Sequence, residues 1–209
     1  MYYQKILIFI TSLLPFGAAH ATQITNGNTI YNNDQIQIAT FAGGCFWCVE
    51  SDFDKLDGVL ETTSGYIGGR TKDPTYYEVS EGGTGHTEAV QIKYDSNKVT
   101  YAQLLDHFWH NIDPTMKNGQ FCDFGAQYRS AIFYHDEEQR KLAEQSRAKL
   151  EKTKPFNAPI VTQIVPASIF YPAEERHQDY YQKHAWKYMF YRYTCGRDDR
   201  LEKLWGKAG

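Results

Sequence analysis

The chain has 209 residues, of which 42% are hydrophobic and 22% charged, and this composition excludes a disordered, collagen-like or coiled-coil protein. The length fits one domain of ordinary size or two very small ones. The 22 basic and 25 acidic residues leave a net charge of -3, which gives no strong attraction to nucleic acid or anionic lipid.

The N-terminal segment has the pattern of a removable export signal. Lys5 precedes the apolar run Ile6–Leu14, and Ala19-His20-Ala21 resembles a cleavage site. The run is too short to cross roughly 30 Å of hydrocarbon as a helix. Residues 1–21 are therefore predicted to be a signal peptide and residues 22–34 a flexible leader, so the protein is expected to be exported, periplasmic or secreted. The alternatives are an uncleaved membrane anchor and an N-terminal helix packed on the domain.

Residues 35–209 are predicted to form one domain, because no repeat and no linker divides them. Runs of β-branched, aromatic or alternating residues predict strands over 35–41, 61–66, 88–94, 130–134 and 160–165. Helices are predicted from Cys45 to Gly58 and over 101–111, 137–152 and 174–189, with Thr100 and Asp136 as N-caps. A long loop separates the second and third strands. This order predicts an α+β fold, in which helices pack against a sheet.

The most informative motif lies where the first strand passes through Gly43 and Gly44 into a helix. Cys45 then occupies the first helical turn, where unpaired N–H groups and the helix dipole favour an anion, so a lowered thiol pKa is predicted. Cys48 lies one turn further on, within the separation that a disulfide tolerates. Redox or nucleophilic chemistry is the favoured interpretation. A structural zinc site would require further ligands, and no second CxxC is present; a plain structural disulfide is the remaining alternative.

A second motif is a glutamate on a strand. Alternation places Glu88 on the same face as Val90, Ile92 and Tyr94, toward the apolar side. Burial raises the pKa of a carboxyl group, so Glu88 could act as a general acid near neutral pH. A buried ion pair or a shifted register would explain the same pattern.

Two other clusters of polar residues do not indicate one particular function. Asp123, Tyr128 and Arg129 lie close together before a strand and could bind a polar ligand or hold a loop. His107 and His110 are three residues apart on a helix but lack a third ligand, so no metal site is predicted.

Taken together, the motifs resemble those of A-type peptide-methionine sulfoxide reductases, over about residues 38–205. The matching strings are Gly-Cys-Phe-Trp at 44–47, Gly65-Tyr66 with Gly68-Gly69, Pro74-Thr75-Tyr76, Gly85–Val90, Asp113-Pro114-Thr115 and Gln127–Ala131. With Cys48, the first string is similar to a Cys-Phe-Trp-Cys subgroup. The resemblance implies a two-layer α+β sandwich and reduction of the S epimer of methionine sulfoxide, free or in oxidised proteins and peptides, in protein repair.

The resemblance also implies roles for individual residues. Cys45 matches the nucleophile, Glu88 the acid, and Phe46 with Trp47 the wall around the substrate methyl group. Tyr76, Tyr128 and Asp123 match residues that bind the sulfoxide oxygen or support that binding.

The recycling step is expected to follow from the sulfenic acid left on Cys45. Cys48 would condense with it to a disulfide, and a thioredoxin-like dithiol would reduce that disulfide, with no metal or bound organic cofactor. Cys195 is the alternative recycling cysteine, because many family members keep such cysteines near the C-terminus. Cys122 is expected to be structural or idle, and the protein to be a monomer.

Two rival functions fit parts of the sequence. A thioredoxin-like disulfide exchanger would explain an exported CxxC, although it does not need an acid on an apolar strand face. A zinc-binding or adhesive envelope protein would instead hold metal tightly and have unreactive thiols.

Overall fold

The computed structural model describes residues 23–26, 29–32 and 35–206. Within the first 33 residues, β1 (Gln23–Asn26) and β2 (Thr29–Asn32) pair in antiparallel fashion. The predicted leader therefore contains two strands, and its flexibility stays a prediction. The predicted signal peptide lies outside the described residues.

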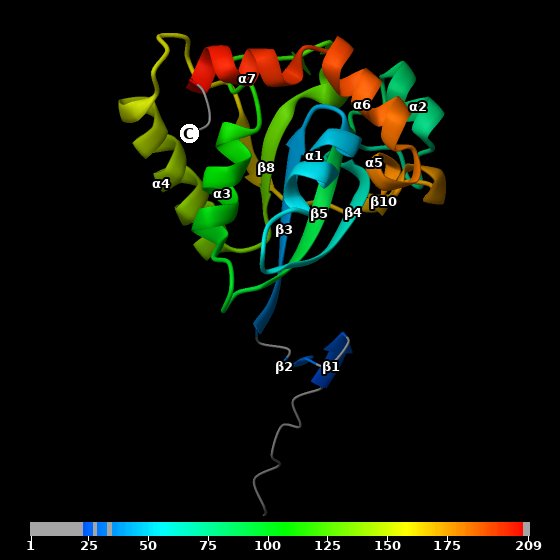
Figure 1. The fold of residues 1–209 in the computed structure, drawn as a ribbon, viewed down its shortest axis with the longest axis vertical. Helices are drawn as coiled ribbons and strands as arrows, with labels where there is room; N and C mark the ends of the chain where they lie inside the picture. The colour runs from blue at the N-terminus through cyan, green and yellow to red at the C-terminus, as the bar shows by residue number, and fades with distance from the viewer. Residues whose placement is uncertain (1–22, 27–28, 33–34, 207–209) are drawn as a thin grey trace, which may run out of the picture. The chain divides into compact units, whose positions relative to one another are not determined.

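The unit from residue 34 onward is built on a six-stranded sheet in the order β10-β4-β5-β3-β8-β9 (Figure 1). The strands are β3 (Ile36–Gly43), β4 (Val59–Ile67), β5 (Thr87–Asp95), β8 (Ser130–Tyr134), β9 (Gln163–Pro166) and β10 (Tyr171–Pro172). The β8–β9 pair is parallel and the other neighbours are antiparallel. A separate small hairpin joins β6 (Gly119–Gln120) to β7 (Asp123–Phe124). The predicted α+β fold is confirmed.

The described part of the chain contains seven α-helices. They are α1 (Phe46–Phe53), α2 (Tyr76–Glu81), α3 (Tyr101–His110), α4 (Glu137–Thr153), α5 (Tyr180–Lys183), α6 (Ala185–Thr194) and α7 (Arg197–Trp205), with 3-10 turns η2 (Ala126–Tyr128) and η3 (Glu175–His177). Thr100 and Asp136 accept hydrogen bonds from the backbone as predicted N-caps.

Two helix predictions differ from the structure. The first helix ends at Phe53, before the predicted end at Gly58. The segment 174–189 is not continuous, because Asp179 has a left-handed backbone (φ 53°) and His184 leaves the helical region before α6 begins. The short helices α2 and α7 were not predicted. Thr75 starts α2 with a capping box to Glu78, a local signal inside the segment predicted as a long loop.

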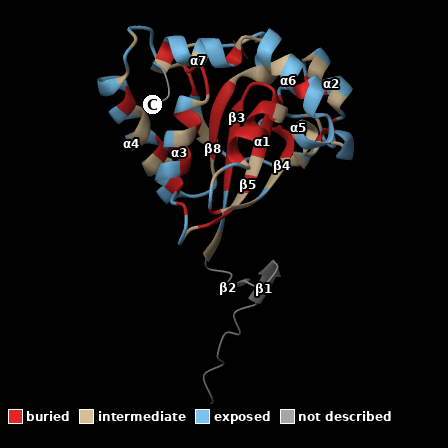
Figure 2. Ribbon diagram, viewed as in Figure 1, coloured by how far each residue is buried: buried red, intermediate tan, exposed pale blue. Residues whose placement is uncertain are grey.

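The main core lies between the sheet and the helices α1, α3 and α4. Phe41 of β3 stacks on Phe53 of α1 and Phe108 of α3, with ring centroids 5.3 and 5.0 Å apart. Figure 2 shows the buried residues concentrated in the central strands and the inner helix faces.

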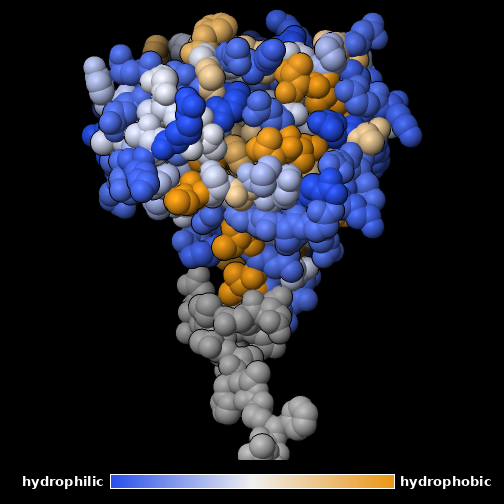
Figure 3. Space-filling view, turned by 180° about the vertical axis from the view of Figure 1, so that it is seen from behind, coloured by the Kyte–Doolittle hydropathy of each residue, from blue (hydrophilic) through white to orange (hydrophobic). Residues whose placement is uncertain are grey.

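A smaller cluster covers the other face of the sheet. Ala42, Ala89 and Ala131 lie there with Ile67 and Phe133, against the segment that carries Ala167 and Phe170. Alanine side chains let this segment pack close to the strands. Seen from behind, the surface is mostly hydrophilic, with separate hydrophobic patches (Figure 3).

A buried ion cluster joins α1 to the C-terminal helices. Asp52 lies 2.8 Å from Arg192 and 3.4 Å from Arg197. Arg197 also donates to the carbonyls of Gly43 and Asn111, at 3.2 and 2.7 Å. Breaking a buried pair leaves an uncompensated charge, so this cluster fixes α6 and α7 at the strand end that leads into Cys45.

Glu50 gives a stability prediction. This side chain is buried under α1, and burial, together with the charges of Asp54 and Asp179, raises its pKa from 4.5 to about 8. Between those two pH values the folded chain holds one proton more than the unfolded chain. The contribution of Glu50 to the free energy of unfolding therefore falls as pH rises across this window, by about 1.4 kcal/mol per pH unit. Glu50→Gln should stabilise the protein by on the order of 1 to 3 kcal/mol at pH 7 and flatten this slope in urea unfolding. An unchanged slope would contradict it, with exposed Glu138→Gln as the control.

Candidate active site

Cys45 lies where β3 turns into α1, as predicted. Gly44 has a φ of +89°, and a Cβ there would lie 2.5 Å from the Cβ of Gln120, so the turn requires glycine. Cys45 is the N-cap of α1, and its carbonyl accepts the N–H groups of Cys48 and Val49 at 3.1 and 3.3 Å. Cys45 is a buried residue, only 7% exposed.

Cys45 and Cys48 are both free, buried and hydrogen-bonded to each other through their side chains. The prediction of a lowered pKa for Cys45 is wrong. Burial raises its pKa well above the ordinary value, and Cys48, Glu88 and Asp123 add to the effect. The hydrogen bond from Cys45 lowers the pKa of Cys48. Desolvation by the whole fold therefore outweighs the local effect of the helix start, and Cys45 rests as a thiol.

Glu88 lies beside Cys45. Its Oε2 accepts the N–H of Phe46, the residue after Cys45, at 3.0 Å. The side chain is on the buried face of β5, and burial raises its pKa from 4.5 to about 8, even though this hydrogen bond lowers it. A protonated carboxyl thus lies at the start of α1, near enough to raise the pKa of the Cys45 thiol.

Phe46 and Trp47 form an aromatic wall on the first turn of α1. The Phe46 ring lies 6.4 Å from Trp47, 5.9 Å from Tyr66 and 6.3 Å from Tyr76. Trp47 stacks on Tyr180 at 3.7 Å. Its indole N–H donates to Nδ1 of His177 at 3.2 Å, which fixes the ring orientation.

The structure brings the three polar residues of the resemblance to this same region. Burial raises the pKa of Tyr76 to about 12, and the nearby charges of Glu88, Cys45 and Asp123 contribute. Tyr128 has its pKa raised by burial, with contributions from these same neighbours. Both phenols therefore stay protonated and can donate hydrogen bonds. Burial also raises the pKa of Asp123.

Three further residues support the site, and sequence analysis did not predict their roles. Glu174 accepts the N–H of Tyr76 and the O–H of Tyr66, each at 2.9 Å. His177 holds Trp47, and Tyr191 of α6 donates to Asp123 at 2.5 Å. These residues belong to a tyrosine-rich C-terminal segment that looks like ordinary packing, and no local signal separates them from their neighbours.

Glu174→Ala tests this support. The backbone N–H of Tyr76 and the O–H of Tyr66 would both lose their acceptor, so the Tyr76 phenol would be less well held. For the sulfoxide substrate that the resemblance implies, kcat/KM should fall at least about tenfold, since even one unsatisfied polar group costs about 1 to 3 kcal/mol. Glu175→Ala is the matched control, because Glu175 is exposed and pairs with Lys183 on the surface. Equal kinetics for the two variants would remove Glu174 from this role.

The other two cysteines form a disulfide between Cys122 and Cys195. Among the described residues, Cys122, Asp123 and Cys195 place their potential metal-ligand atoms within 4.8 Å of one another, but the two sulfur atoms are bonded to each other. His107 instead contacts the carbonyl of Asp52. His86, which has no predicted role, is buried and contacts Gly69 and Thr71.

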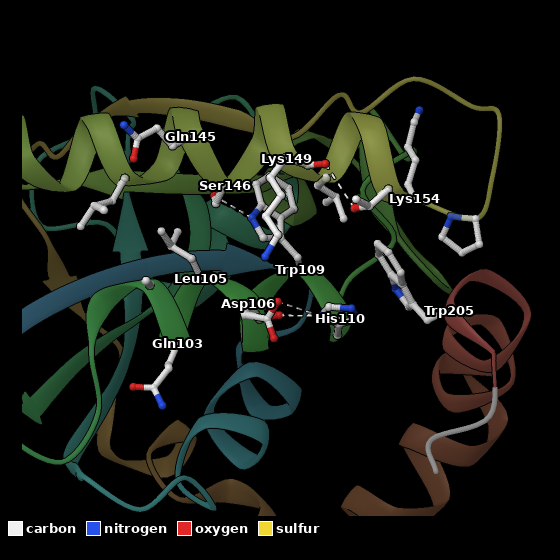
Figure 4. A pocket seen from close by; sticks show the side chains of 15 residues that line it. Gln103, Leu105, Asp106, Trp109, His110, Gln145, Ser146, Lys149, Lys154 and Trp205 are labelled. Atoms are coloured by element: carbon white, nitrogen blue, oxygen red, sulfur yellow. Dashed lines mark hydrogen bonds and ion pairs between the residues drawn. The ribbon is translucent and has the colours of Figure 1, made fainter.

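A groove away from this site contains none of the cysteine, glutamate or tyrosine residues described above. It opens between α3 and α4, has a volume of about 730 Å³ and is lined by residues such as Trp109, Lys149 and Trp205 (Figure 4). Among the described helices, none is both long and apolar enough to span a bilayer.

Because the two thiols lie within one helical turn and a protonated carboxyl lies close by, the site is suited to redox chemistry at sulfur, the chemistry of a thiol-dependent oxidoreductase. Residues 37–209 match the model of the family described as peptide methionine sulfoxide reductase. The chain belongs to this family, and it reduces methionine sulfoxide to methionine.

Relatives support this assignment over most of the chain. The peptide methionine sulfoxide reductase MsrA of Bacillus licheniformis is 52% identical over 171 residues, which cover 82% of this chain and 94% of the relative. An MsrA/MsrB protein of Vibrio cholerae is 46% identical over 91% of this chain and 50% of its own length. The reduced form of Mxr1 from Saccharomyces cerevisiae matches with a TM-score of 0.69 and 32% identity, over 74% of this chain and 89% of that one.

Proposed function

We propose that the protein reduces the S epimer of methionine sulfoxide with Cys45 as nucleophile and Glu88 as acid. The proposal rests on the hydrogen bond that Glu88 accepts from the N–H of Phe46, the residue that follows Cys45, and on the effect of Glu88 on the pKa of the Cys45 thiol. The sulfoxide oxygen is a poor leaving group, so it must be protonated while sulfur is attacked. Membership of the Cys-Phe-Trp-Cys subgroup is part of this proposal.

The first step transfers oxygen. Glu88 gives its proton to the sulfoxide oxygen, while the sulfur of Cys45 bonds to the substrate sulfur. Tyr76 and Tyr128 donate hydrogen bonds to that oxygen, and each such donor contributes about 2.7 to 4 kcal/mol in the transition state. The hydroxyl group then passes from the substrate sulfur to the sulfur of Cys45, and the S–O and S–S bonds to the substrate sulfur break, so that methionine leaves and Cys45 becomes a sulfenic acid. The proton that Cys45 loses restores Glu88.

The second step forms a disulfide. The thiol of Cys48, already hydrogen-bonded to Cys45, attacks the sulfenic sulfur and releases water. This disulfide would be reduced by an external dithiol of the thioredoxin kind. A solved structure shows yeast Mxr1 in complex with Trx2, at 24% identity to this chain. Cys195 is the less favoured resolving cysteine, because its sulfur is bonded to Cys122.

Selection of one epimer follows from three fixed directions around sulfur. The methyl group packs against Phe46 and Trp47, the oxygen points to the phenols, and Cys45 attacks from the helix start. Only one arrangement then leaves the remaining carbon chain free to extend outward. Incubation with each pure epimer and a dithiol should release methionine from the S epimer; release from the R epimer alone would refute the proposal.

Export and a monomeric state are also proposed. The charge, apolar run and Ala-His-Ala site of residues 1–21 support export to the periplasm or medium. The substrates of the protein would be oxidised proteins and peptides or free methionine sulfoxide. N-terminal sequencing of the protein from cell fractions, with light scattering for its mass, tests both points.

A further inference from the structure

The Cys122–Cys195 disulfide connects two segments next to the proposed site. It joins residues 73 apart in sequence, with their Cα atoms 5.0 Å apart. Cys122 lies in the turn between β6 and β7, and Cys195 ends α6. The N–H of Cys122 also lies 3.2 Å from the sulfur of Cys195. Cys122 is exposed, so a dithiol can reach the bond from solvent.

The turn that carries Cys122 is strained. Phe121 has a φ of 56°, a left-handed conformation that costs a residue with a side chain roughly 1 to 2 kcal/mol. Such a conformation persists only where surrounding contacts hold it. The guanidinium of Arg197 lies 4.4 Å from the centre of the Phe121 ring, and the disulfide holds the next residue. Both restraints come from the C-terminal segment.

The strained turn positions Asp123, which follows Cys122 directly. Asp123 accepts the O–H of Tyr191 at 2.5 Å, and the N–H of Cys195 donates to the carbonyl of Tyr191 at 2.9 Å. The disulfide and the Tyr191 hydrogen bond are therefore parallel connections between the same two segments. The charge of Asp123 raises the pKa of the Cys45 thiol and of the Tyr76 and Tyr128 phenols. A movement of the turn would thus move a carboxylate at the site.

We propose that Cys122 and Cys195 form a second redox-active pair, whose closed state holds Asp123 in place for substrate binding. A dithiol reductant opens the pair: one of its sulfurs forms a mixed disulfide with Cys122 or Cys195, and its second sulfur displaces that cysteine. The S–S bond breaks, the two cysteines gain two electrons and two protons, and the reductant becomes a disulfide. Substrate binding weakens when the pair opens. The proposal rests on the proposed place of Asp123 in the substrate site.

The test measures the first turnover in a Cys48→Ser background, where no reductant is needed. Methionine formed is followed against the concentration of the S sulfoxide, with Cys122→Ser, with Cys195→Ser and with both. Each should raise the half-saturating concentration about tenfold and change the saturating rate less than about twofold, since loss of one hydrogen bond to a charged group weakens binding by about that factor. The three effects should be equal, because each variant removes the same bond. Unchanged half-saturation, even with a lower Tm, would overturn the proposal.

A redox titration separates opening of the bond from loss of a side chain. The same Cys48→Ser protein is equilibrated in mixtures of dithiothreitol and its oxidised form before the assay. The half-saturating concentration should shift in one transition, together with the appearance of two further thiols, and the doubly substituted chain should show no transition. Thiols that appear without a shift in the half-saturating concentration would refute the proposal.

The place of Asp123 in the substrate site is tested separately, with Asp123→Asn in the chain whose Cys122–Cys195 disulfide is intact. An unchanged half-saturating concentration would remove Asp123 from the site, whatever the cysteine variants show.

Discussion

Cys48→Ser should release one methionine per chain and then stop, even with an excess of a thioredoxin-like reductant. Cys45 would still take the oxygen as a sulfenic acid, but the thiol hydrogen-bonded to it would be gone. Cys45→Ser should release none, because a serine hydroxyl is a far weaker nucleophile toward sulfur. Methionine counted per chain, with and without reductant, gives both results.

Two outcomes would contradict this assignment. Continued cycling of Cys48→Ser would make Cys195 the resolving cysteine, which would first have to leave its bond with Cys122. Methionine from Cys45→Ser would remove Cys45 as the nucleophile. The matched control is the Cys122→Ser, Cys195→Ser chain, which should keep cycling at saturating sulfoxide.

Glu88→Gln should slow the first turnover by about 10² to 10⁴ at pH 7, the range expected for loss of a general acid. The amide keeps the size of the side chain but cannot protonate the sulfoxide oxygen. Glu88 has a pKa raised to about 8 by burial, so its protonated fraction falls as pH rises through that value. The first-turnover rate of the unaltered chain should therefore decline above about pH 8, and this decline should be absent in Glu88→Gln.

Glu50→Gln is the control variant for the pH dependence of the first-turnover rate. Its carboxyl is also buried with a pKa of about 8, but its neighbours are Asp54 and Asp179 rather than the thiols. Glu50→Gln should keep the decline in rate near pH 8 while changing stability. A normal rate in Glu88→Gln, or loss of the decline in Glu50→Gln, would show that Glu88 is not the acid.

Local patterns accounted for much of the scaffold. The N-caps Thr100 and Asp136 act within three residues, and strand alternation depends only on the period of the chain, so both were predictable. The segment 174–189 was mispredicted because its breaks at Asp179 and His184 have no proline or glycine to mark them. The short helix α7 was not predicted. It begins with the buried Arg197, and arginine is a residue type expected on the surface.

By itself, the sequence determined the two neighbouring thiols at a helix start and the burial of Glu88, because spacing within one turn and alternation along one strand are local properties. Only the tertiary structure decided that Cys45 rests protonated, that Cys122 pairs with Cys195, and that Glu174, His177 and Tyr191 support the site. Desolvation and contacts between distant segments depend on how the whole chain packs, and no local pattern encodes them.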